Sequence, residues 1–121
     1  MLIPRLHFCG NCLEAISVYE KAFNTKTDRI ERLDNEKIIH ASMNIHGQTV
    51  FLNDRFGNKN RSVDCAVHLI IKFKNKEELL TCYEALKDGS EIIDPFIKTP
   101  YSELVGNFMD KFGVLWGFMA E

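Results

Sequence analysis

The chain has 121 residues and a formal net charge of -2 at pH 7, and 45% of its residues are hydrophobic. This length and composition fit a globular domain with a buried core. The slight negative charge gives no electrostatic reason to expect a nucleic acid or an anionic membrane as partner. No stretch approaches the length of a membrane span, and no signal peptide is visible at the start, MLIPRLHF. We therefore expect a cytoplasmic protein whose four cysteines are reduced.

The feature that predicts the architecture is an internal repeat. The pattern N-x-x-E-x-x-x-x-Y-E begins at Asn11 and begins again 64 residues later at Asn75. Each copy follows a short apolar stretch and is typical of an amphipathic helix, in which the asparagine is the N-cap and the glutamate completes a capping box. The repeat predicts one module used twice, with boundaries at about 1–58 and 64–121.

Alternation of apolar and polar residues predicts strands around both helices. Both modules are expected to have the order βαβββ. In the first, we expect strand 2–9, a helix beginning at Asn11 that buries Leu13, Ile16, Tyr19 and Phe23, a polar edge strand 25–33, a turn at Asp34 and Asn35, and strands 40–46 and 48–54. After a connection at 55–64, we expect strand 65–73, a helix beginning at Asn75 that buries Leu79, Leu80, Tyr83 and Leu86, a short strand 91–94, a loop 95–103, and strands 105–109 and 114–119.

Three stretches of the sequence carry a family resemblance. They are IPRLHF-x-GNC-x-EAI-x-x-Y-x-x-x-F near the start, HASMNIHG in the middle and DKFGV-x-W near the end. Together they resemble the PhnB-like branch of the vicinal-oxygen-chelate superfamily, which also holds glyoxalase I, extradiol dioxygenases and bleomycin-resistance proteins. The resemblance covers nearly the whole chain. It implies an α+β, glyoxalase-like fold, in which two βαβββ modules curl into an incomplete barrel around a cleft, and a homodimer.

In the metal-dependent members of this superfamily, four cleft-facing positions hold a divalent ion. The resemblance places two of them, on the first strand of each module, at His7 and His68. Imidazole is a common ligand of zinc, nickel, iron and manganese. The two late-strand positions, usually carboxylates, fall on Phe51 and Gly117, which are 66 residues apart. Neither side chain can bind a metal, and two histidines alone fall short of the usual sites.

Other residues leave two interpretations open. Cys9 and Cys12 form a C-x-x-C at a helix N-terminus, where the dipole would lower a thiol pKa, but Cys12 also belongs to the structural motif of the family. His40 is either a general base or an ordinary hydrogen-bonded histidine. Arg5 and Lys72, on the cleft-facing side of their strands, either bind an anionic ligand or merely reach solvent.

We interpret the chain as a PhnB-like protein that binds a small molecule in a cleft, with its activity unproven. The alternative is a lyase, isomerase or dioxygenase that uses zinc, nickel, manganese or iron at His7 and His68. No glycine-rich nucleotide-binding motif occurs, so the methyltransferase-like names that some relatives carry are not supported. Tyr101 is expected either to cover the cleft as a lid or to pack on a sheet. The expected lining of the cleft is His7, Phe51, His68, Tyr101, Leu115, Gly117 and Met119.

Overall fold

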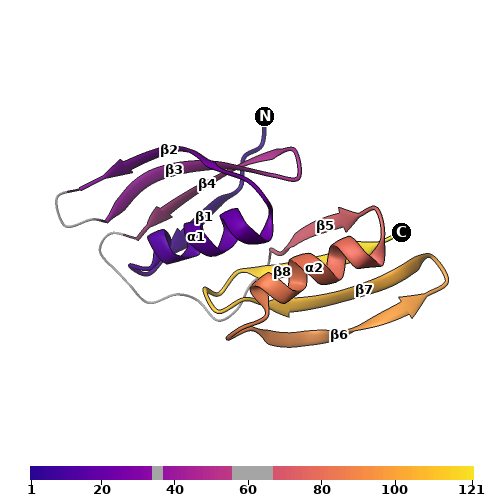
Figure 1. Ribbon diagram of the computed structural model, residues 1–121. Coiled ribbons are helices and arrows are strands. Elements are labelled where there is room, and N and C mark those ends of the chain that lie inside the picture. The colour runs from indigo at the N-terminus through magenta and orange to yellow at the C-terminus, as the bar shows by residue number, and fades with distance from the viewer. Residues whose placement is uncertain (34–36, 56–66) are drawn as a thin grey trace. The chain divides into compact units, whose positions relative to one another are not determined.

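A computed structural model describes residues 1–33, 37–55 and 67–121 (Figure 1). The chain divides into two compact units, residues 1–61 and 62–121. The first unit contains β1 (Arg5–Phe8), α1 (Cys12–Ala22), β2 (Thr27–Arg32), β3 (Ile38–Ile45) and β4 (Gln48–Asp54). The second contains β5 (Leu69–Phe73), α2 (Lys76–Leu86), β6 (Glu91–Thr99), β7 (Ser102–Met109) and β8 (Leu115–Ala120). The order βαβββ therefore occurs twice, which confirms the predicted fold class.

The four strands of the first unit form one sheet in the order β1-β4-β3-β2. β1 pairs with β4 in parallel, and the other neighbours are antiparallel. The hairpin between β3 and β4 turns at His46 and Gly47, whose φ angles of 50° and 85° are both positive, as a tight two-residue turn requires. β2 is an edge strand, as its polar sequence predicted.

The core of the first unit lies between α1 and one face of this sheet. Alternate strand residues point toward the helix, and among them Phe8, Ala41 and Leu52 are at most 1% exposed. The predicted helix stripe is wrong at Leu13, which is 40% exposed. The remaining members of the buried helix face are Cys12, Ala15, Ile16, Tyr19 and Phe23, a spacing that places Leu13 on the flank of the helix.

The start of α1 is held by a side chain that is distant in sequence. Asn11 is the N-cap residue as predicted, but within the described residues its side chain makes no cap hydrogen bond, so the Asn11 half of the predicted capping box is wrong. Instead, one carboxylate oxygen of Asp54 accepts hydrogen bonds from the backbone N–H groups of Gly10 and Cys12, both at 3.0 Å, and the other accepts from Ile38 N–H at 3.0 Å. Asp54 is 2% exposed. Asp54, the last residue of β4, therefore connects that strand to the β1–α1 turn and to the beginning of β3.

The second unit repeats this plan with the sheet order β5-β8-β7-β6. Here the predicted cap is confirmed, because Asn75 Oδ1 accepts from the backbone N–H of Glu78 at 2.9 Å. The predicted stripe is wrong at Leu80, which is 43% exposed, while Cys82 is 3% exposed in its place. Aromatic rings fill the core, with centroids 4.9 to 5.0 Å apart for the pairs Phe73–Phe118, Phe108–Phe118, Tyr83–Phe108 and Tyr83–Phe96.

The predicted loop at 95–103 is wrong, because β6 and β7 form a continuous hairpin there. β6 contains Pro95, which a strand tolerates only where no ladder N–H is needed, and β6 is an edge strand of its sheet. The pairing with β7 shifts register on both sides of this proline. Because the proline and the polar flanks disguise an edge strand, the sequence pattern indicated a loop.

Two other predictions differ at their edges. β1 begins at Arg5 and β5 at Leu69, so both first strands are shorter than expected. The predicted turn at Asp34 and Asn35, the start of the second module at Cys65 and most of the connection lie outside the described residues. No helix in the described ranges has the length and apolarity needed to cross a membrane.

Candidate functional site

Polar and aromatic side chains gather on the face of the first sheet that is turned away from α1, which we call the far face. Parallel pairing places Arg5 beside Phe51 and His7 beside Asn53. Because side chains alternate along a strand, these four residues share the face opposite Phe8 and Leu52. His40 of β3 joins them. We call these five residues the Arg5 cluster.

Arg5 connects the members of the cluster. Its Nη1 donates to Asn53 Oδ1 at 3.0 Å, and its Nη2 donates to His40 Nδ1 at 3.3 Å. The guanidinium carbon lies 5.1 Å from the centroid of the Phe51 ring, within the range of a cation–π contact. The His40 ring meets the same phenyl ring edge-on, with 4.7 Å between centroids.

Donor and acceptor roles in this network follow from its chemistry. A guanidinium only donates, so the atom of Asn53 that faces Arg5 is the oxygen. The Asn53 amide nitrogen then donates to Asp54 O at 2.9 Å and to His7 Nδ1 at 3.3 Å. His7 Nδ1 must therefore be an acceptor, and the ring proton sits on Nε2. The same reasoning applied to Arg5 and His40 puts the proton of His40 on Nε2.

Burial and nearby positive charge both lower the pKa of His7. Partial burial of the ring lowers its pKa below the usual 6.5, and the positive charges of Arg55 and Arg5 lower it further. Arg55 follows Asn53 with the same alternation, and its buried Nε has no hydrogen-bond partner among the described residues. The far face therefore carries positive charge beside a histidine whose pKa is lowered.

These residues do not fit the divalent metal that the family resemblance implies. A histidine that binds a metal through Nε2 keeps its proton on Nδ1 and donates it to an acceptor. The Asn53 amide nitrogen faces Nδ1 and cannot accept, and turning the amide would point a donor at Arg5. The nearby guanidinium groups also repel a cation. Among the described residues, no group of three or more His, Cys, Asp or Glu side chains is placed to hold a metal ion.

In the second unit, the structure brings two of the predicted site residues together. A Cβ atom added at Gly117 would lie 3.3 Å from His68 Nε2 and 2.8 Å from Asn107 Oδ1. Gly117 therefore leaves the space that the imidazole and the amide occupy. The Asn107 amide is held in turn by Asp94, whose Oδ2 accepts from Asn107 Nδ2 at 2.9 Å. Sequence reasoning missed Asn107 and Asp94, because Asp94 was expected to end its strand.

Strand pairing also shows which positions of the two units correspond. The parallel pair β5 and β8 corresponds to the parallel pair β1 and β4. In the second unit Lys72 lies beside Met119, and in the first unit His7 lies beside Asn53. Lys72 is thus the counterpart of His7. His68, an exposed residue that precedes β5, occupies a different position. The two histidines do not form an equivalent pair within the repeat.

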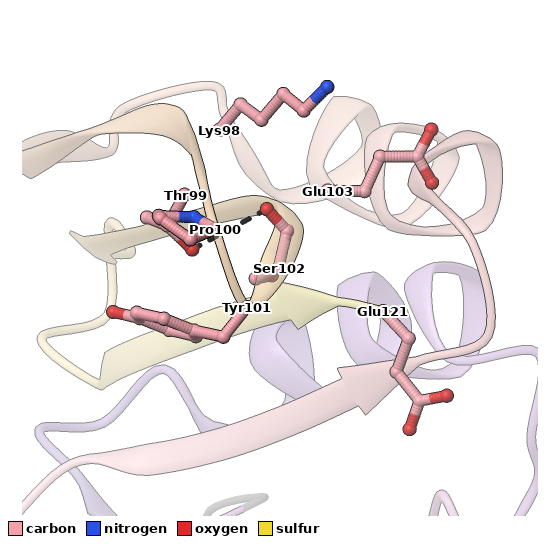
Figure 2. Close-up of a pocket in the computed structure, with 7 residues that line it drawn as sticks. All are labelled: Lys98, Thr99, Pro100, Tyr101, Ser102, Glu103 and Glu121. Atoms are coloured by element: carbon pink, nitrogen blue, oxygen red, sulfur yellow. Dashed lines mark hydrogen bonds between the residues drawn. The ribbon is translucent and has the colours of Figure 1, made fainter.

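Leu115 and Tyr101 belong to the second unit. Leu115 is half-buried at the start of β8, and Tyr101 is 74% exposed in the turn between β6 and β7. Tyr101 borders a pocket of about 260 Å³ (Figure 2). The Ser102 Oγ there lies within hydrogen-bonding reach of both Leu104 O and Ala120 O, so its one hydroxyl proton is committed to the backbone. The pocket is lined by Lys98, Thr99, Pro100, Tyr101, Ser102, Glu103 and Glu121, a set without a catalytic grouping.

The C-x-x-C motif is not activated as its position suggested. Burial raises the pKa of the Cys12 thiol to about 12, and the Asp54 carboxylate adds to this effect. The expected lowering by the helix dipole is wrong, because the Asp54 carboxylate already occupies the helix N-terminus. Cys9, Cys12 and Cys82, the cysteines that the structure describes, are all free.

A family model described as 3-demethylubiquinone-9 3-methyltransferase matches residues 1–119. The chain belongs to this family. A PhnB protein from Bacillus cereus is 27% identical, with a TM-score of 0.89 over 99% of this chain and 98% of that one. Its description provisionally names the same methyltransferase. Protein PA1353 from Pseudomonas aeruginosa is 25% identical, with a TM-score of 0.87 over 100% and 97% of the two chains.

These matches confirm the PhnB-like branch of the vicinal-oxygen-chelate superfamily, to which the sequence motifs pointed. A glyoxylase/bleomycin resistance protein/dioxygenase domain from Frankia is similar in fold, with a TM-score of 0.70 at 17% identity over 99% and 90% of the two chains. A comparison with curated protein sequences found no match. In this PhnB-like chain, the Arg5 cluster joins four polar side chains and one aromatic ring on the far face of the first sheet.

Proposed function

We propose that this PhnB-like protein binds a small molecule on the far face of its first sheet and does so without a catalytic metal. The observation that carries the proposal is the hydrogen-bonded chain Arg5–Asn53–His7. Its polarity leaves His7 with a proton on the nitrogen that a metal would need. The same polarity supplies a hydrogen-bond donor to a ligand.

The surroundings of this chain suit a binding surface. Small-molecule sites combine apolar walls with a few fixed polar groups. Here the half-buried Phe51 supplies the apolar wall, and Asn53, only 7% exposed, fixes the polar groups from below. Arg5 and His7 are exposed, so a ligand can reach them.

The proposal extends to assembly and location. We expect a homodimer that is located in the cytoplasm. Sedimentation of the untagged protein would test the dimer directly. We do not propose the methyl transfer that the family description names. The described strands form two mainly antiparallel sheets, and neither has the glycine-rich turn after a parallel strand that usually holds a nucleotide-containing cofactor.

Metal analysis tests the proposal. Untagged protein would be analysed for bound metal, and its melting temperature would be measured with and without nickel, zinc, manganese and iron(II). A specific metal site raises stability by mass action and gives a saturable shift. We expect no stoichiometric metal and no saturable shift in the wild type. A stoichiometric metal that is lost in His7→Ala would contradict the proposal and support the enzyme alternative.

The variant Asn53→Asp sharpens this experiment. An aspartate beside His7 accepts the Nδ1 proton, which frees Nε2 as a ligand and adds a negative charge. We therefore expect Asn53→Asp to show a larger zinc-induced melting shift than the wild type. Asn44→Asp is the matched control, because the new carboxylate can still accept from Gly47 N–H as Asn44 does and lies away from His7. Equal zinc responses of the two variants would count against the role assigned to Asn53.

A further inference from the structure

We infer that the Arg5 cluster recognises an oxyanion, such as the carboxylate or phosphate group of a small molecule. This inference rests on the proposed function and names the chemical group that the site selects. The donors are the Nε2–H groups of His7 and His40 and the N–H groups of Arg5 that face no acceptor among the described residues.

The number of donors supports this assignment. Arginine has five N–H groups, and the contacts to Asn53 and His40 use two of them. In each imidazole, Nδ1 accepts a hydrogen bond within the network. The nitrogen that remains for a ligand is therefore Nε2, which is a donor. The cluster thus offers a ligand several donors and no side-chain acceptor. A group with several acceptor oxygens matches it, whereas a cation or a hydrogen-bond donor does not.

The charge of this face points the same way, although the whole chain has a net charge of -2. Arg5 and Arg55 both act on His7 electrostatically. On β2, Arg29 pairs with Ser42 and Glu31 pairs with His40, so both share the far face at its edge. Three arginines against one carboxylate leave the described part of this face cationic.

The donors are held in place before a ligand arrives. The buried Asn53 amide bonds to Arg5, His7 and the backbone of Asp54, and Phe51 packs against both Arg5 and His40. Fixed donors lose less entropy on binding than flexible surface lysines do. This separates the cluster from a scattered set of exposed cations.

Anion titration followed by NMR tests the inference. Uniformly labelled protein at low ionic strength would be titrated with sodium phosphate and, separately, sodium acetate, with constant pH and matched sodium chloride as reference. We expect saturable shifts at backbone and imidazole signals of the Arg5 cluster. Arg5→Gln should weaken binding about tenfold or more, because it removes a charged donor. Arg29→Gln, on the edge strand, is the matched control and should change the affinity less than about twofold.

A second variant guards against a folding defect in Arg5→Gln. His40→Phe keeps an aromatic ring against Phe51 and removes the Nε2 donor, so it should also weaken anion binding. Shifts that do not saturate, or that persist unchanged in both variants, would overturn the inference. A neutral molecule that shifts the cluster while neither anion does would overturn it and leave the proposed function standing. Absence of any binding in a broad screen would overturn both.

Discussion

The two units share their build and differ on the far faces of their sheets. In the first unit, β1 and β4 place Arg5, His7, Phe51 and Asn53 on that face. The corresponding positions on β5 and β8 are Ile70, Lys72, Gly117 and Met119. At these four positions the first unit has an aromatic ring and a connected polar network, whereas the second has two aliphatic side chains, a glycine and a single lysine, with His68 and Asn107 beside the glycine. The two units therefore share the positions that pack the core, and the connected polar network is in the first unit.

A second difference concerns one buried aspartate in each unit. Asp54 accepts three backbone hydrogen bonds from two distant segments. Asp110, 4% exposed, accepts from its near neighbours, namely Phe112 N–H, Val114 N–H and the Trp116 indole N–H, at 2.9 to 3.0 Å. The first holds the unit together over a long range, whereas the second shapes a local turn. Substitutions can separate these roles.

The largest expected effect is that of Asp54→Ala. This substitution leaves three buried or half-buried backbone N–H groups without their acceptor. We therefore expect a loss of about 3 kcal/mol or more in the free energy of unfolding. Urea denaturation followed by circular dichroism measures it. Asp94→Ala is the control, because Asp94 is exposed, and it should cost less than about 1 kcal/mol. Similar losses in the two variants would contradict the role given to Asp54.

The next effect tests a core position at which the units differ. Gly106 pairs with Phe118 as Ala41 pairs with Leu52, so the two are counterparts. A Cβ at Gly106 would lie 2.6 Å from a ring carbon of Phe96 and 3.0 Å from its Cα. We expect Gly106→Ala to destabilise the protein by about 1–3 kcal/mol through overpacking. If the same measurement shows no loss or a gain, the contact with Phe96 does not explain the glycine.

The helix caps give a smaller and opposite contrast. Asn75 caps α2 with its side chain, whereas α1 is capped by Asp54. Asn75→Ala should therefore cost about 1 kcal/mol of unfolding free energy, and Asn11→Ala only a few tenths. Equal losses in parallel urea titrations would mean that Asn11 does cap its helix in solution.

The smallest effect is one of thiol reactivity. Burial raises the pKa of Cys12 and of Cys82 to about 12. Near pH 8 both thiols remain protonated and shielded, so they should resist alkylation, while the exposed Cys9 should react. Peptide mapping by mass spectrometry after brief iodoacetamide treatment measures each site. Rapid modification of Cys12 in the folded protein would restore the redox interpretation of the C-x-x-C motif.

The fold was largely predictable because its signals are local or repeated. The alternation along β3 and the residues of β4 were predicted closely, and the 64-residue repeat predicted βαβββ twice. Long-range choices were not predictable. Asp54 lies 42 residues from the Cys12 N–H that it caps, so Asn11 was the natural local candidate. Similarly, β6 was not predicted in full, because an edge strand can contain a proline such as Pro95 and the sequence does not show which strand is at an edge.

The candidate site was predictable only in part. Alternation placed Arg5 and His7 on one face, and the family resemblance with the 66-residue spacing of the repeat placed Phe51 at a cleft position. Neither could show that Asn53 connects Arg5 to His7, because that link depends on the register of β1 against β4. The direction of the hydrogen bonds, which decides between a metal and an anion, follows only from that contact.

The most direct test of the central claim is the protonation of the His7 ring, read from its two nitrogen chemical shifts at neutral pH. The network of Arg5 and Asn53 predicts a neutral ring with the proton on Nε2 in the wild type, and a proton on Nδ1 in Asn53→Asp. His7→Gln identifies the signals. A wild-type ring with its proton on Nδ1 would contradict the account, because His7 would then have the form that a metal-binding histidine needs.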